Sequence, residues 1–367
     1  MADKMARRSV DFDPDPDDYY SATRFDVLVS QMREVKRMLR EGSSAQLRVA
    51  YILLDNAAEV IMYRSIYPEL INNDFHATIL RRWEEVVAGT DDPTALEHYE
   101  EAKRRVIPPK KLHKIENDFA EKANFLLGRG KVIPDLAASL KELHRYRNEM
   151  YHRDHVRYDV LKAVTAIYFD VACLLLERYD ETTQHPVWLG PPITVGGNVT
   201  GEEFKPPASV LVDELKSGMK WDWPAIAREL KENLEGRFQK LTSTVKVLDL
   251  LLGNIGDDVV LKLAQTYRSH ATSGPDDLKN LAVEHLSTKD LGQWVRRTER
   301  LDPNGDHIRF FNHLAEIERS FEALEEPVQA LFEDLERTHT LAVEEQIEAR
   351  RIERFNNRLG DREPDQG

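Results

Sequence analysis

The residues best suited to chemistry lie in one short stretch, Arg147-Asn148-Glu149-Met150-Tyr151-His152. An arginine and a histidine suffice to cleave RNA without a metal, because the ribose 2′-hydroxyl supplies the nucleophile. The imidazole of His152 can accept that proton or protonate the leaving oxygen near neutral pH. The guanidinium of Arg147 can bind the phosphate and stabilise the charge that develops in the transition state. Asn148 can orient the histidine or hold the phosphate, and Tyr151 can support the site or stack on a base.

Arg147 occupies an unusual position on its predicted helix. It stands where an apolar stripe would place another aliphatic residue, and that stripe consists of Leu136, Leu140, Leu143 and Met150. Burying a guanidinium without a partner is costly, so either a carboxylate pairs with it or this face lines a site or an interface. Asp55 and Glu59, which belong to a polar stripe on an earlier apolar helix, are the candidate carboxylates.

The spacing between Arg147 and His152 restricts how they can act together. A separation of five residues is about 140° around a regular helix, so one straight helix would not direct both side chains at one phosphate. The sequence therefore predicts that the helix ends or distorts here, or that two copies of the motif meet across a two-fold homodimer.

The charge around this motif differs from that of the whole chain. The 367 residues carry a formal net charge of −14, which on its own argues against binding a polyanion. A site responds to its local field, however, and residues 141–157 hold five Lys/Arg against three Asp/Glu. We predict contacts with RNA phosphates, the alternative being ordinary helix-surface charges, for His144, Arg145, Arg153, His155 and Arg157.

Apolar periodicity predicts an all-α fold whose first half is an antiparallel helical bundle over residues 23–180. An acidic, flexible segment, 1–22, precedes it. Pro68 is expected just beyond the end of the second helix. The predicted helices cover about 24–40, 45–67, 74–87, 94–105, 110–127, 134–152 and 157–178.

Proline and glycine are frequent in residues 181–207, which predicts a linker with at most one short hairpin. Residues 208–367 then form a second, long-helix-rich α domain, with helices at about 224–254, 256–269, 284–298 and 307–358. Pro327 predicts a break or kink in the last of these. Residues 315–358 carry twelve Asp/Glu and six Lys/Arg. Either this is a solvated helix face, or the segment folds back at Pro327 and regulates the basic cleft.

Composition also excludes several kinds of site. The single cysteine, Cys173, lies in an apolar run, so a disulfide framework is impossible and a buried structural thiol is expected. Neither a metal-ligand spacing nor a glycine-rich phosphate loop is present, so we predict no metal and no cofactor. No apolar run reaches the length of a membrane span, which predicts a cytoplasmic protein without membrane contact.

The motif Arg147-Asn148-x-x-x-His152 resembles the signature of the HEPN superfamily, in which an arginine and a polar neighbour are followed a few residues later by a histidine. The resemblance covers about residues 24–180, including the apolar helix LRVAYILLDNAAEVIM. It implies a helical bundle that forms a homodimer, so that two motifs make one composite cleft. It further implies an RNA-cleaving hydrolase, a metal-independent endoribonuclease such as a toxin of a toxin–antitoxin system or an effector of antiviral, anti-phage defence.

Two other interpretations stay open at this point. The bundle could be a HEPN module that binds RNA, a nucleotide or a protein without cutting, with the second half as a helical scaffold. The whole chain could also be a plain scaffold, in which Arg147, Asn148 and His152 cap carbonyls and pair with neighbouring carboxylates. If the protein is a toxin, we expect a neutralising or sensor protein as a partner.

Overall fold

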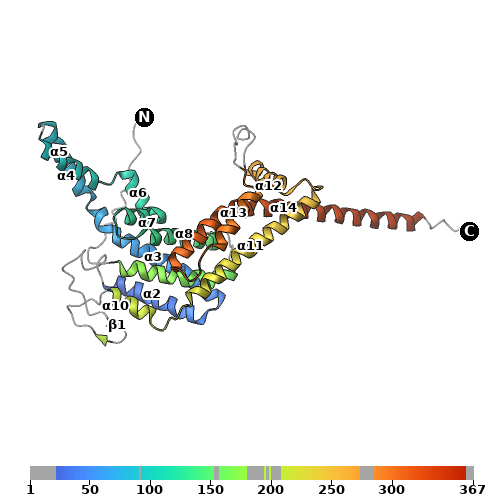
Figure 1. The fold of residues 1–367 in the computed structure, drawn as a ribbon, viewed down its shortest axis with the longest axis horizontal. Helices are drawn as coiled ribbons and strands as arrows, with labels where there is room; N and C mark the ends of the chain where they lie inside the picture. Colours follow the sequence, from blue (N-terminus) through green and yellow to red (C-terminus); the bar gives the residue numbers. More distant parts are fainter. Residues whose placement is uncertain are drawn as a thin grey trace, which may run out of the picture. The chain divides into compact units, whose positions relative to one another are not determined.

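The computed structural model describes residues 22–90, 92–152, 157–179, 194–195, 198–199, 208–272 and 285–360. These residues are almost entirely helical, which confirms the all-α class (Figure 1). Within them, two-residue strands β1 (Thr194–Val195) and β2 (Asn198–Val199) pair antiparallel, in the stretch where the sequence allowed one short hairpin. The predicted flexible segment, 1–22, lies outside the described residues except for Ala22.

The chain divides into two compact units, and each is described by itself. The first contains the chain up to Ala227 together with Pro303–Asn312, and the second contains Arg228–Asp302 and the chain from His313. The described helices of the first unit are α2 (Ala22–Glu41), α3 (Ser44–Ile71), α4 (Asn73–Ala88), α5 (Pro93–Arg105), α6 (Pro109–Asn117), α7 (Phe119–Gly128), α8 (Pro134–His152), α9 (Tyr158–Glu177) and α10 (Ala208–Lys216).

Helices α3 and α9 form the centre of the first unit. Both are strongly apolar, and nearly every residue of α9 from Val160 to Leu176 is buried. Gly42 ends α2 with φ 71°, and Ser43 caps α3 by accepting a hydrogen bond from the backbone N–H of Gln46. This two-residue turn makes α2 and α3 antiparallel neighbours. Helix α8 packs on α3, α7 and α9, which sets its last turns against the middle of α3.

Helix boundaries differ from the sequence prediction at two places in this unit. The predicted helix over 110–127 is two helices, because Asp118 adopts an extended conformation and caps α7 by accepting from the N–H of Glu121. Pro68 lies inside α3 rather than beyond it. Its position in the last turns limits the loss of helix stability, since a proline there interrupts the backbone hydrogen bonds close to the end of the helix.

The second unit contains most of α11 (Trp223–Leu251) and α14 (His307–Gly360), together with α12 (Asp257–Thr272) and α13 (Thr288–Glu299). Ser287 and Asp290 form a capping box at the start of α13. Of the break or kink predicted at Pro327, the break is wrong, because α14 continues as a helix through this residue and the chain does not fold back there. Burial of Leu324, Val328 and Leu331 on either side offsets the proline's cost.

The observed division between units does not coincide with the predicted linker, 181–207. Helix α10 belongs to the first unit because Leu211, Val212 and Leu215 are buried where it packs on α2 and α9. Residues 303–312 return to the same unit, where His307 reaches Asp170 of α9. No helix among the described residues is long and apolar enough to cross a membrane.

Candidate functional site

The predicted motif lies in the last turns of α8, which ends at His152. The Nε atom of Arg147 lies 3.5 Å from Oδ2 of Asp55 on α3, and its Nη1 donates a hydrogen bond of 3.0 Å to Oδ1 of Asn148. The Arg147 side chain is 24% exposed and that of Asp55 is 5% exposed. The carboxylate that the sequence suggested for Arg147 is therefore Asp55, and the Asn148 amide contacts the arginine.

Asp55 also holds a second titratable side chain of α8. The Nδ1 atom of His144 lies 2.9 Å from Oδ1 of Asp55. Because an ionised carboxylate only accepts hydrogen bonds, Nδ1 carries the proton, and Nε2 of the neutral ring is left as the basic nitrogen. His144 and Arg147 are three residues apart and share a helix face. One buried carboxylate thus positions both an imidazole and a guanidinium.

Aromatic residues from two other helices fix this arrangement. The hydroxyl of Tyr168 on α9 donates to Oδ1 of Asp55 at 2.8 Å, and the ring of Phe119 on α7 stacks on His144 at 4.0 Å between centroids. Burial, together with the Asp55 charge, raises the pKa of Tyr168 well above its usual value, so this phenol stays a donor. The hydroxyl of Tyr51 donates to the carbonyl of Leu143 at 2.8 Å and ties α3 to α8.

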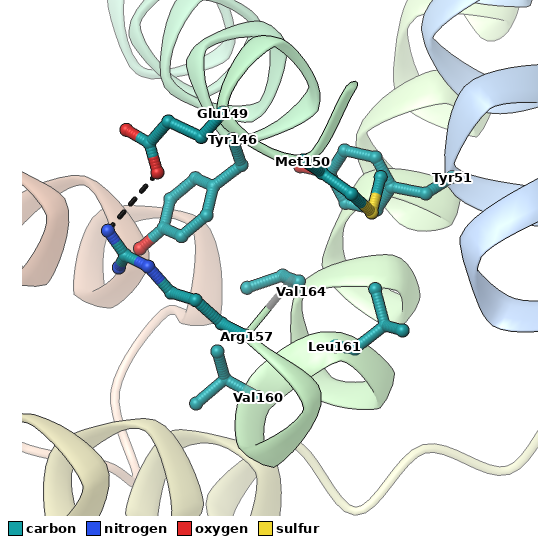
Figure 2. A pocket seen from close by; sticks show the side chains of 8 residues that line it. All are labelled: Tyr51, Tyr146, Glu149, Met150, Arg157, Val160, Leu161 and Val164. Carbon is teal, nitrogen blue, oxygen red and sulfur yellow. Dashed lines mark hydrogen bonds and ion pairs between the residues drawn. The ribbon is translucent and has the colours of Figure 1, made fainter. Parts of the chain in front are cut away.

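The opposite face of α8 carries a separate charged cluster. Arg145 forms ion pairs with Glu142 and Glu149, and Arg157 approaches Glu149 to 3.2 Å. Both guanidinium groups lie 5.0 Å from the ring centre of Tyr146. Figure 2 shows Arg157 directed at Glu149 beside this ring. Two predicted RNA contacts, Arg145 and Arg157, are therefore partly neutralised by carboxylates, which reduces their attraction for phosphate.

The cavity drawn in Figure 2 is too small for a substrate. It has a volume of about 20 Å³ and is lined by α3, α8 and α9 side chains that include Tyr51, Met150 and Val164. A space of this size holds about one water molecule. We interpret it as a packing defect beside the Arg157–Glu149 pair.

The remaining predicted residues fall into two groups. Glu59 contacts Nζ of Lys122 at 2.8 Å and not Arg147, so it belongs to a neighbouring pair. Tyr151 and His152 are the last helical residues of α8, and the described geometry does not extend to their side chains. Arg153 and His155 lie outside the described residues altogether. The placement of His152 relative to Arg147 therefore stays a prediction.

The sequence did not reveal Tyr168 or Phe119 as parts of this arrangement. Both look like ordinary core aromatics, because their polar partner comes from another helix far along the chain. What the sequence did show was two polar residues at unusual positions, a carboxylate on an apolar helix and an arginine on an apolar stripe. Among the described residues no group of three His, Cys, Asp or Glu side chains could hold a metal. The one cysteine is buried, and burial raises its pKa to about 12.

No protein-family model, no curated protein and no solved structure matches the chain. The resemblance to the HEPN superfamily accordingly rests on the motif and on the helices that carry it. The evidence for a function is therefore the geometry and chemistry of the site.

Proposed function

We propose that this protein is a metal-independent endoribonuclease of the HEPN type. The observation that carries the proposal is the buried carboxylate of Asp55, which holds Arg147 and His144 on one face of α8, the helix that ends at His152. A guanidinium and an imidazole held on one helix face, with a second imidazole at the end of that helix, could provide the charge stabilisation and proton transfer that RNA cleavage requires.

In this mechanism the ribose 2′-oxygen attacks the adjacent phosphorus as an imidazole removes its proton. The bond to the 5′-oxygen breaks, and that oxygen takes up a proton, leaving a 2′,3′-cyclic phosphate and a 5′-hydroxyl. We assign proton transfer to His152 and stabilisation of the phosphorane charge to Arg147. We assign a second contact with the phosphate to His144, while Asp55 and Tyr168 act as positioning residues.

The proposal includes a homodimer in which the ends of two α8 helices form one composite cleft. The separation of about 140° between Arg147 and His152 on a regular helix supports it, because a second copy of the motif would supply the missing partner of each residue. By its resemblance, the protein would serve as a toxin or as an effector of anti-phage defence, with a neutralising or sensor protein as partner.

The test is an assay on total RNA with and without EDTA. We expect cleavage to persist in the chelator and to leave 2′,3′-cyclic phosphate ends, while DNA of the same sequence stays uncut because it lacks the 2′-hydroxyl. Activity that disappears in EDTA and returns with Mg²⁺ would refute this mechanism.

A second candidate function is binding of RNA without cleavage. It is favoured by the pairing of Arg147 with Asp55, because a neighbouring carboxylate weakens the stabilisation that this arginine can give to a transition state. Such a module would retain RNA in a binding assay and release no products. The same assay on total RNA therefore separates the two functions.

A further inference from the structure

The most basic surface segment of the chain is not the motif helix. Residues 103–114 contain six Lys/Arg and no Asp/Glu, in a chain whose net charge is −14. They form the last turn of α5, a three-residue connection and most of α6 (Figure 1). All six cations are exposed, and we call them the basic strip: Lys103, Arg104, Arg105, Lys110, Lys111 and Lys114.

Half of the basic strip has an ordinary structural role. Lys103, Arg104 and Arg105 lie at the C-terminal end of α5, where the helix dipole favours cations. Lys103 also approaches Glu100 to 3.6 Å, and Arg105 pairs with Glu101. Exposed pairs of this kind contribute little to stability. The positions of these three residues are therefore explained by the helix itself and do not indicate a ligand.

Lys114 has the same explanation, because it lies in the last turn of α6, but Lys110 and Lys111 do not. Lys110 and Lys111 lie in the first turn of α6, where the partial positive charge of the helix end repels cations. That first turn contains no acidic residue, and within the described part of the chain Lys110, Lys111 and Lys114 form no ion pair. Positions that disfavour folding of the local helix are more readily explained by an external anion than by stability.

The strip leads directly to the candidate site. Phe119, which stacks on His144, follows Lys114 by five residues, so the two are at most about 18 Å apart along the chain. Close to both in the sequence, Glu116 of α6 and Lys122 of α7 line a hollow of about 410 Å³ together with side chains of α3. This volume lies in the range of small-ligand sites. A strand held on the strip therefore reaches Arg147 within a few nucleotides.

The hollow is lined by groups that suit a nucleobase. Lys122 is buried and pairs with Glu59 at its wall, Asn56 offers an amide, and Tyr63 offers an aromatic ring. Carboxylate and amide groups bind base edges, and aromatic rings stack on bases in single-stranded RNA. An anionic membrane surface would use the lysines alone and leave this hollow unexplained.

We propose that the basic strip is a phosphate-binding surface for single-stranded RNA, which it delivers past the hollow to the end of α8. This inference rests on the proposed function, since it concerns the substrate of that site. Each phosphate neutralised on a single strand releases counterions and adds about −0.7 to the slope of log K against log salt. Three lysines of α6 therefore account for a slope of about −2.

The experiment measures binding of a 2′-O-methyl single-stranded RNA, which cannot be cleaved, to the full chain over a series of salt concentrations. The variant carries Lys110→Ala, Lys111→Ala and Lys114→Ala. At 0.1 M salt we expect binding to be up to about 100-fold weaker, with a shallower salt slope and affinities that converge near 1 M. On cleavable RNA, KM should rise while kcat is unchanged, because these side chains do not contact the reacting phosphate.

The matched control removes three exposed lysines of the second unit, Lys240, Lys246 and Lys262, and so changes the net charge equally. It should bind as the wild type does. If the wild type cleaves RNA and the α6 variant binds it normally, the proposed role of the basic strip in RNA binding is wrong, while the proposed function stands. If the wild type neither binds nor cleaves RNA, the proposed function itself fails. Preference for phosphatidylserine vesicles over RNA would overturn the strip as an RNA surface.

Discussion

Each unit of the molecule contains an arginine that is mostly buried, and the two differ in how their charge is balanced. Arg237 of α11, 18% exposed, faces three glutamates of α14: Glu318, Glu322 at 3.6 Å and Glu325 at 2.5 Å. Arg147 faces Asp55, which divides its oxygens among Arg147, His144 and Tyr168.

This difference decides which arginine can bind an anion. Around Arg237 the carboxylates outnumber the cation, so a phosphate would be repelled, and the pairs serve to join α11 to α14. Around Arg147 the carboxylate that the described contacts show is Asp55, and it is shared with an imidazole, so these described groups do not repel an anion as the three glutamates do. Burial of an arginine is therefore not a sign of function, whereas the balance of charge around it is.

The largest expected effect comes from replacing each of these arginines with alanine. Arg147→Ala should reduce RNA cleavage by about 10³-fold, because it removes the cation that stabilises the transition state. Arg237→Ala should leave cleavage unchanged in the folded protein but lower the free energy of unfolding by about 3 kcal/mol, since three carboxylates lose their partner. Cleavage rates and denaturant unfolding of both variants measure this. Equal loss of cleavage in the two folded variants would contradict the assignment of Arg147 to cleavage and of Arg237 to stability alone.

The next prediction concerns the composite site. His152→Ala should reduce cleavage by about 10²–10⁴-fold, the usual contribution of a general acid or base. Each motif variant alone is then inactive, but a mixture of Arg147→Ala and His152→Ala protein should recover part of the activity when subunits exchange. Rates before and after mixing, with sedimentation to establish the dimer, measure this. A strictly monomeric protein that still cleaves RNA would rule the composite site out.

A smaller effect is expected from Asp55→Asn, which keeps the side-chain volume but removes the charge. Arg147 and His144 then lose the negative charge and one of the two carboxylate oxygens that position them, and a displacement of about 1 Å can cost up to about 100-fold in rate. The control is Glu59→Gln, which loses the ion pair with Lys122 but does not contact Arg147. We expect kcat to fall in the first variant and not in the second. A normal kcat for Asp55→Asn would show that this carboxylate does not position the catalytic groups.

The sequence predicted α8 well because its signals are local. Pro134 starts the helix, the apolar stripe follows, and the misplaced Arg147 pointed to a carboxylate that proved to be Asp55. Asp118 was missed although it is a good capping residue, since the apolar pattern continues on both sides of it. Contacts that join distant segments carry no local signal, so neither Tyr168 nor the glutamates around Arg237 could be foreseen.

The placement of α10 and of residues 303–312 was missed for the same reason. Their ties to the first unit converge on Asp170, whose carboxylate accepts from Nε2 of His307 at 2.9 Å and from Nζ of Lys216 at 2.8 Å. Burial alone would raise the pKa of Asp170, but these two hydrogen bonds outweigh it and lower the pKa below 3.8. Proline and glycine content between 181 and 207 says nothing of such pairs.

The smallest expected effect is the acid sensitivity of this cluster. Because the folded pKa of Asp170 is lowered, its contribution to stability is present above about pH 4 and is lost as the pH falls through the folded value. Wild-type stability should therefore drop below about pH 4, and Asp170→Asn should show a weaker drop from a lower plateau. Thermal unfolding between pH 3 and pH 7 measures this. Identical pH profiles would contradict the assignment.

The same cluster determines how regulation by the acidic end of α14 can be tested. Cutting the chain within 181–207 removes both Lys216 and His307, so Asp170 would be left buried without either partner, and we expect that fragment not to fold stably. A chain ending at Glu336 keeps Leu331 and the other buried residues that the structure describes in α14, and every removed residue whose exposure is described is exposed. We expect it to stay folded and to cleave RNA at the full-length rate, as a solvated helix face requires. A faster rate would instead show that the acidic segment restrains the site by competing with RNA phosphates.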